Sequence, residues 1–143
     1  MTTIAFDGVT MAADGRSTYG DCITDENYVK IKSINGKLFG FDGEVGFMKK
    51  VEHEISINLS VDDREVDKEF MYEYILYDAG YLLSYRNDRK YPTVVYPPFA
   101  IGTGGLAAIA VMRAGLNAEE AVKVAITMDV YSGGKITVLT LGD

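Results

Sequence analysis

The sequence has 143 residues, of which 48% are hydrophobic and 24% charged, a balance typical of globular domains that excludes a disordered chain. At about 150 residues per domain, this length predicts a single domain over residues 1–143. The formal net charge is −7, from 14 basic and 21 acidic residues, which argues against a nucleic-acid-binding surface. No apolar run approaches the roughly 20 residues of a membrane span, so no membrane association is expected.

The N-terminus and the cysteine content indicate a compartment. The first eight residues, MTTIAFDG, have neither the basic segment nor the long apolar segment of a signal peptide. Cys22 is the only cysteine, which excludes an internal disulfide and suits a reducing environment. We therefore expect a cytoplasmic location.

Two β-hairpins are predicted near the N-terminus. In the first, residues 2–6 and 9–14 are β-rich runs separated by Asp7-Gly8, a two-residue turn sequence. In the second, residues 28–34 and 37–41 flank Asn35-Gly36, the strongest short hairpin signal.

Beyond residue 43 the hydrophobic period changes to that of a helix. Apolar side chains recur every fourth position, at Phe47, Val51, Ile55 and Leu59. An amphipathic helix is therefore expected from 44 to about 59. The acidic segment 61–69 is predicted as a loop, 70–78 and 81–86 as a strand pair, and the proline-containing segment 92–102 as extended chain.

The last third of the chain predicts two helices and a strand. Residues 104–115 are small and apolar and form a helix closed by Gly115. Asn117 begins a second helix, with Glu120 completing a capping box. Residues 135–141 are apolar on both faces, which predicts a strand in the middle of a layered structure. The element order favours antiparallel sheets between helices.

The hairpin turns bring chemically useful residues together. Counting outward from a two-residue turn at 7–8 places Asp14 diagonal to Thr2 across the first hairpin, and the second turn places Lys30 beside Gly40. Diagonal neighbours lie roughly 7–8 Å apart, within reach of long side chains. Four residues suited to acyl-transfer chemistry are thus carried to the ends of two sheets.

Removal of Met1 would give Thr2 both a hydroxyl nucleophile and a free α-amine, and threonine is small enough for this removal to be expected. The unperturbed amine pKa of roughly 7.7–8.0 suits a base near neutral pH. A nearby Lys30 ammonium would lower this pKa, and Asp14 would hold Lys30 in place. The N–H of Gly40 is then the candidate donor to an oxyanion.

Five segments together resemble the proteasome β-subunit and HslV type of threonine peptidase, in the N-terminal-nucleophile (Ntn) hydrolase superfamily. They are TTIAFDGVTMAADGRST at 2–18, YVKI at 28–31, KLFGFDG at 37–43, AIGTGG at 100–105 and DVYSGG at 129–134. Each motif alone is weak, but all five in this order are specific. The resemblance covers roughly two thirds of the chain.

The resemblance implies one catalytic site made of seven residues: Thr2, Asp14, Lys30, Gly40, Thr103, Asp129 and Ser132. The first four correspond to the nucleophile, its acidic partner, the family lysine and the glycine that faces the oxyanion. Asp129 and Ser132 correspond to the pair that hydrogen-bonds the nucleophile's amine. Thr103 stands where the family usually has serine in a G-S-G turn. Leu38 and Asp42, which flank Gly40, are candidates for shaping the substrate pocket.

The resemblance also implies the α+β fold of Ntn hydrolases, a four-layer αββα sandwich. It implies a homo-oligomeric ring that takes polypeptide substrates, fed by an ATP-dependent unfoldase, with no cofactor or metal. Only 26 residues separate Gly43 from Phe70, where the family usually has a longer helical pair. We therefore expect a shortened helical segment at about 44–70.

The favoured function is that of a threonine peptidase that hydrolyses peptide bonds in unfolded polypeptides. Two alternatives stay open. The short segment after Gly43 and the presence of Met1 are compatible with a non-catalytic structural or interaction subunit, and a small-amide hydrolase would use the same Thr2 chemistry on other substrates. His53 lies between two glutamates on a polar helix face, so no Ser-His-Asp triad is predicted, and no Cys/His spacing indicates zinc.

Overall fold

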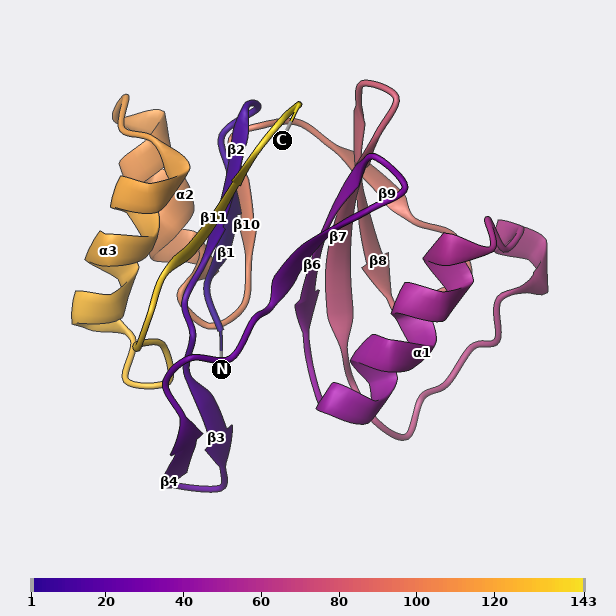
Figure 1. Ribbon diagram of the computed structural model, residues 1–143, viewed down its shortest axis with the longest axis horizontal. Coiled ribbons are helices and arrows are strands. Elements are labelled where there is room, and N and C mark those ends of the chain that lie inside the picture. The colour runs from indigo at the N-terminus through magenta and orange to yellow at the C-terminus, as the bar shows by residue number, and fades with distance from the viewer. Residues whose placement is uncertain (1, 143) are drawn as a thin grey trace.

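The computed structural model describes residues 2–142, which form two main β-sheets between helical layers (Figure 1). The first sheet contains, in spatial order, β10 (Phe99–Ile101), β1 (Ile4–Phe6), β2 (Thr10–Ala13) and β11 (Thr137–Thr140). The second contains β5 (Ile31–Ile34), β6 (Lys37–Asp42), β7 (Glu73–Asp78), β8 (Tyr81–Arg86) and β9 (Thr93–Val95). All pairings in both sheets are antiparallel.

Helices cover the outer face of each sheet. On the first sheet lie α2 (Gly105–Arg113) and α3 (Ala118–Met128), and on the second lies α1 (Val45–Ser56) (Figure 1). The capping box predicted for α3 is present, since Asn117 Oδ1 accepts the Glu120 N–H and Glu120 Oε1 accepts the Asn117 N–H. The layers follow the order helix, sheet, sheet, helix, which confirms the predicted four-layer sandwich.

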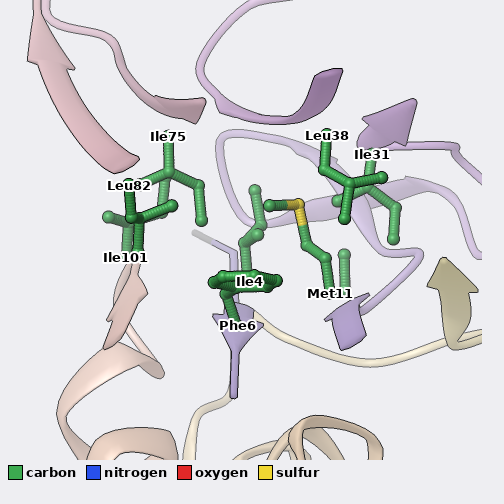
Figure 2. Close-up of a cluster of buried hydrophobic side chains, with 9 residues drawn as sticks. Ile4, Phe6, Met11, Ile31, Leu38, Ile75, Leu82 and Ile101 are labelled. Atoms are coloured by element: carbon green, nitrogen blue, oxygen red, sulfur yellow. The ribbon is translucent and has the colours of Figure 1, made fainter. Parts of the chain in front are cut away.

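The main core lies between the two sheets (Figure 2). It consists of Ile4, Phe6, Met11, Ala13, Ile31, Leu38, Ile75, Leu82 and Ile101. Because side chains alternate along a strand, each strand contributes every second residue to this layer. Leu38 belongs to this core, so it does not shape a surface pocket, contrary to the prediction.

The second hairpin has its predicted register, with Ile31 paired to Gly40. The first hairpin does not. Phe6 pairs with Met11 rather than with Val9, because Asp7 Oδ1 accepts the N–H groups of both Val9 and Thr10 and closes a longer turn. This side-chain capping shifts the register by two residues, a change that the two-residue turn signal did not anticipate.

The remaining elements agree only in part with the expectation. Strand β11 lies in one of the two inner layers, as predicted, but at the edge of the first sheet, where its residues are half-buried or exposed rather than buried on both faces. Residues 17–25 form an additional hairpin, β3 (Ser17–Tyr19) and β4 (Cys22–Asp25), which the sequence did not predict. The segment expected to be shortened contains α1, a single 3-10 turn at Val61–Asp63 and irregular chain. Within residues 2–142, none of the helices has the length and apolar character needed to cross a membrane.

Candidate active site

Thr2 lies immediately before β1, and its hydroxyl is the centre of a buried polar cluster. The Lys30 ammonium, which precedes β5, donates to Thr2 Oγ1 at 2.7 Å and to Asp14 Oδ1 at 2.8 Å. Asp14 has no exposed surface, and Lys30 and Thr2 are only 3% and 4% exposed. The structure thus brings together three of the predicted residues, from three different segments of the chain.

Asp14 is held by backbone donors as well as by Lys30. Its Oδ1 accepts the Thr3 N–H at 3.0 Å, and its Oδ2 accepts the N–H groups of Gly133 at 3.0 Å and Arg16 at 3.2 Å. This network gives both carboxylate oxygens of a fully buried side chain hydrogen-bond partners. Burial lowers the pKa of Lys30, and the charge of Asp14 opposes that effect.

A second chain of hydrogen bonds reaches the Thr2 backbone nitrogen. Thr103 Oγ1 accepts the Thr2 N–H at 3.3 Å and donates to Asp129 Oδ2 at 2.6 Å. Ser132 Oγ donates to the same carboxylate oxygen at 2.6 Å and lies 2.8 Å from Thr3 Oγ1. Burial tends to raise the pKa of Asp129, but the hydroxyls of Ser132 and Thr103 outweigh it, so the pKa is lowered. Asp129 is therefore a stable acceptor that orients the Thr103 hydroxyl.

The turn between β10 and α2 binds the Thr2 carbonyl group. Gly104 N–H donates to Thr2 O at 3.2 Å. Gly102 has φ +92°, and a Cβ there would overlap the Thr2 carbonyl oxygen. The turn therefore requires glycine at 102 for its left-handed conformation and for close approach. It places the Thr103 hydroxyl beside the Thr2 nitrogen.

Gly40 is the one predicted site residue that the structure does not bring to this cluster. It lies in the inter-sheet core, where a Cβ would come within 2.7 Å of Ile4 Cγ2. Its role is close packing between two sheets, which also explains why glycine suits a central strand position. The prediction that Gly40 donates to an oxyanion therefore needs correction.

A cavity of about 610 Å³ opens beside Thr2 and Lys30. Its wall includes Asp42 at the end of β6, Gly43, and Val45 at the start of α1. Apolar side chains form much of the remaining wall: Tyr28, Phe41, Val45, Phe47, Phe70 and Met71. The rest of the lining consists of Arg16, Ser17, Thr18, Tyr19, Gly20 and Glu44. Asp42 thus lines the cavity, as the sequence suggested, and Gly43 lines it whereas Gly40 does not.

Sequence reasoning missed Gly43, Gly104 and Glu73. The motif KLFGFDG contains two glycines, and only the structure shows which one follows the end of β6 and faces Thr2. Gly104 belongs to the AIGTGG motif, but only the structure shows that its N–H donates to the Thr2 carbonyl. Glu73 belongs to no motif; its Oε1 accepts the Gly102 N–H at 3.2 Å, a contact between two distant segments.

No protein-family model and no curated protein matches this sequence. Solved structures do match it over nearly its whole length. HslV from Trypanosoma brucei is 22% identical, with a TM-score of 0.72, over 97% of this chain and 98% of that chain. Thiobacillus denitrificans BPH is 19% identical, with a TM-score of 0.70, over 99% and 98% of the two chains. The complex of BPH with epoxomicin is 17% identical, with a TM-score of 0.71, over 99% of each chain.

At these identities the matches show a shared overall fold. These matches agree with the resemblance that the sequence motifs show. The chain therefore has the fold of HslV, a four-layer αββα sandwich.

Proposed function

We propose that this protein is an N-terminal threonine peptidase whose nucleophile is Thr2. The observation that carries the proposal is the 2.7 Å contact between Lys30 Nζ and Thr2 Oγ1, with Lys30 itself fixed by Asp14. A buried ammonium beside a hydroxyl stabilises the alkoxide character that develops as the hydroxyl attacks. The epoxomicin complex of a protein with this fold supports the same chemistry.

The reaction begins once Met1 is removed and the α-amine of Thr2 is free. Thr2 Oγ attacks a peptide carbonyl, and the α-amine accepts the hydroxyl proton, through a water molecule, before passing it to the leaving amine. The product of this step is an ester between the acyl group and Thr2. A second water then hydrolyses the ester and regenerates the threonine.

Gly43 is the better candidate for the oxyanion donor. Its N–H follows the last paired residue of β6, Asp42, and it lines the cavity beside Thr2. A backbone N–H at that place stabilises the negative oxygen of a tetrahedral intermediate. The apolar wall of the cavity suits an apolar side chain on the residue that supplies the attacked carbonyl.

The natural substrates are proposed to be unfolded polypeptides. We further propose that the chain assembles as a homo-oligomeric ring and receives its substrates from an ATP-dependent unfoldase, because the resemblance to HslV implies both. A cytoplasmic location fits the single, exposed Cys22.

The test is intact mass spectrometry before and after incubation with a peptide epoxyketone, which reacts with both the hydroxyl and the free amine of an N-terminal threonine. We expect loss of Met1 and a single adduct, with no adduct on Thr2→Ala and an unchanged adduct on Thr10→Ala, a control on neighbouring strand β2. Adduct formation by Thr2→Ala would refute the assignment. A protein that keeps Met1 and forms no adduct would instead be a non-catalytic subunit, and turnover of small amides without peptide cleavage would indicate a small-amide hydrolase.

A further inference from the structure

Two carboxylates lie side by side on the sheet that faces Thr2. Asp42 and Glu73 are directly paired at the end of the β6–β7 ladder. Paired residues of antiparallel strands project to the same face, and Gly40, two residues before Asp42, faces the inter-sheet core. Both carboxylates are therefore directed toward the first sheet, in which β1 follows Thr2.

Each carboxylate has its own connection to the nucleophile. Asp42 lines the cavity beside Thr2 and Lys30, and its carboxylate accepts a hydrogen bond from the Thr2 side chain. Glu73 Oε1 accepts the Gly102 N–H, and Gly102 begins the turn that binds the Thr2 carbonyl and nitrogen. Asp42 thus contacts the hydroxyl of Thr2, and Glu73 is connected to the backbone of Thr2 through the turn that begins at Gly102.

The surrounding charges do not neutralise this pair. Lys30 makes its short ion pair with Asp14, and Arg86, which is opposite Glu73 on β8, pairs with Asp88 at 3.1 Å. Burial raises the pKa of Asp42, an effect opposed by the Lys30 charge and the Thr2 hydroxyl and reinforced by Asp14. Burial and the nearby Asp42 raise the pKa of Glu73, and Arg86 opposes them. Two partly desolvated carboxylates therefore lie near a site that gains an α-amine when Met1 is lost.

We propose that Asp42 and Glu73 are positioning residues whose negative charge stabilises the ammonium form of the Thr2 α-amine and so sets the pH at which that amine becomes a base. Lys30 and Arg16, which line the same cavity, act in the opposite direction, because a neighbouring cation favours the neutral amine. Asp129, which accepts from the Thr103 hydroxyl that binds the Thr2 nitrogen, acts in the same direction as the pair, as do Asp14 and the cavity-lining Glu44. Glu73 also holds the turn at Gly102 in place, because its carboxylate accepts the Gly102 N–H. The consequence for rate rests on the proposed peptidase function, whereas the effect on the amine does not.

The test uses protein with Thr2 as its first residue, checked by intact mass and labelled with ¹³C-threonine. The Thr2 chemical shifts are followed against pH in wild type, Asp42→Asn, Glu73→Gln and the double variant. We expect the midpoint of the amine titration to fall by about 0.5–1 pH unit in each single variant and further in the double variant, from the loss of a charge at short range. Asp78→Asn, at the other end of β7, is the matched control and should leave the midpoint unchanged.

The rate of epoxyketone adduct formation provides a second readout. Its acid limb should move to lower pH in Asp42→Asn and Glu73→Gln, while Glu73→Ala should also lower the rate at the optimum, because alanine cannot accept the Gly102 N–H and glutamine can. An unchanged Thr2 titration in both Asp42→Asn and Glu73→Gln would overturn the inference. Failure of wild type to form the adduct would overturn the proposed function alone, since the titration would still decide the role of the two carboxylates.

Discussion

Asp14 lies directly opposite Thr3, with Thr3 N–H donating to Asp14 Oδ1 at 3.0 Å and Asp14 N–H donating to Thr3 O at 3.1 Å. Asp14 therefore reaches Thr2 only through Lys30, whose ammonium bridges Asp14 and the Thr2 hydroxyl. In this arrangement the backbone of Thr3 aligns the Asp14 carboxylate, the carboxylate aligns Lys30, and Lys30 aligns the Thr2 hydroxyl.

Replacement of Lys30 by methionine should both abolish activity and destabilise the fold. It would leave Asp14 buried without its cation, and removing one partner of a buried ion pair typically costs about 3–5 kcal/mol. Lys32→Met, on the same strand, removes a half-exposed pair with Glu52 and should cost less than about 1 kcal/mol. Urea unfolding and adduct formation measure the two effects. Equal stability of the two variants would contradict the buried-pair interpretation.

Substitution of Gly102 by alanine should displace Thr2. The new Cβ would overlap the Thr2 carbonyl oxygen, in addition to the strain of a side chain at φ +92°. Gly115→Ala is the matched control, because Gly115 has φ +104° but open space around it. The control should lose only about 1–2 kcal/mol of folding stability, from the strain of a side chain at positive φ, and should remain active. Thermal unfolding and adduct formation should separate overlap from strain, and an active Gly102→Ala protein would refute the close approach.

Asp42→Asn and Asp129→Asn should change stability with opposite sign at pH 7. The pKa of Asp42 is raised in the fold, chiefly by burial, so its ionised form destabilises the protein at neutral pH and the asparagine variant should melt at a higher temperature. The pKa of Asp129 is lowered in the fold, so its ionised form is stabilising and its loss should lower the melting temperature.

Both differences should shrink as the pH falls. The cost of ionised Asp42 disappears between its raised folded pKa and the unfolded value of about 3.9, and the contribution of Asp129 is lost from about 3.9 downward through its lowered folded pKa. Melting temperatures measured at pH 7, 5 and 3 check the sign. A destabilised Asp42→Asn variant at pH 7 would show that Asp42 is needed as a structural ion.

Val45→Glu should weaken reaction with peptides that carry an apolar residue at the attacked carbonyl. Val45 lines the cavity with 46% of its surface exposed, and a carboxylate there would be desolvated by an apolar substrate. We expect a fall in kcat/KM of at least about tenfold, the effect of 1.4 kcal/mol in binding. Val66→Glu, equally exposed outside the cavity lining, should have no effect. Equal loss in both variants would show that the apolar wall does not select substrates.

The sequence predicted the parts of the fold that local signals specify. Asn35-Gly36 adopts positive φ at both positions and sets the register that carries Lys30, and the Asn117 capping box begins α3 as expected. The register of the first hairpin was wrong because Asp7 caps its own turn, a side-chain contact that a two-residue turn pattern does not contain. Local chemistry of this kind needs the side chain's geometry as well as its identity.

The site residues that belong to sequence motifs were predicted. Those whose place in the site depends only on tertiary contacts were missed. Thr2, Lys30 and Asp14 meet as the motifs implied, and Thr103 takes the place of a serine with its hydroxyl in use. The motif KLFGFDG contains both Gly40 and Gly43, and the motif alone does not show which of the two lines the cavity beside Thr2. That depends on where β6 ends. Glu73 had no sequence signal, since its significance comes from Gly102, 29 residues further along the chain.

The two helical layers differ in a way that makes them optically distinct. The chain has no tryptophan, and the layer under α1 contains stacked rings, with Tyr74 and Tyr85 4.6 Å apart at an interplanar angle of 5°. The core under α2 and α3 consists instead of alanine, valine, isoleucine and methionine side chains. Near-ultraviolet circular dichroism therefore reports the order of the second sheet and α1, and a tryptophan introduced on α2 or α3 would give a separate fluorescence signal for the layer that holds the Thr2 turn.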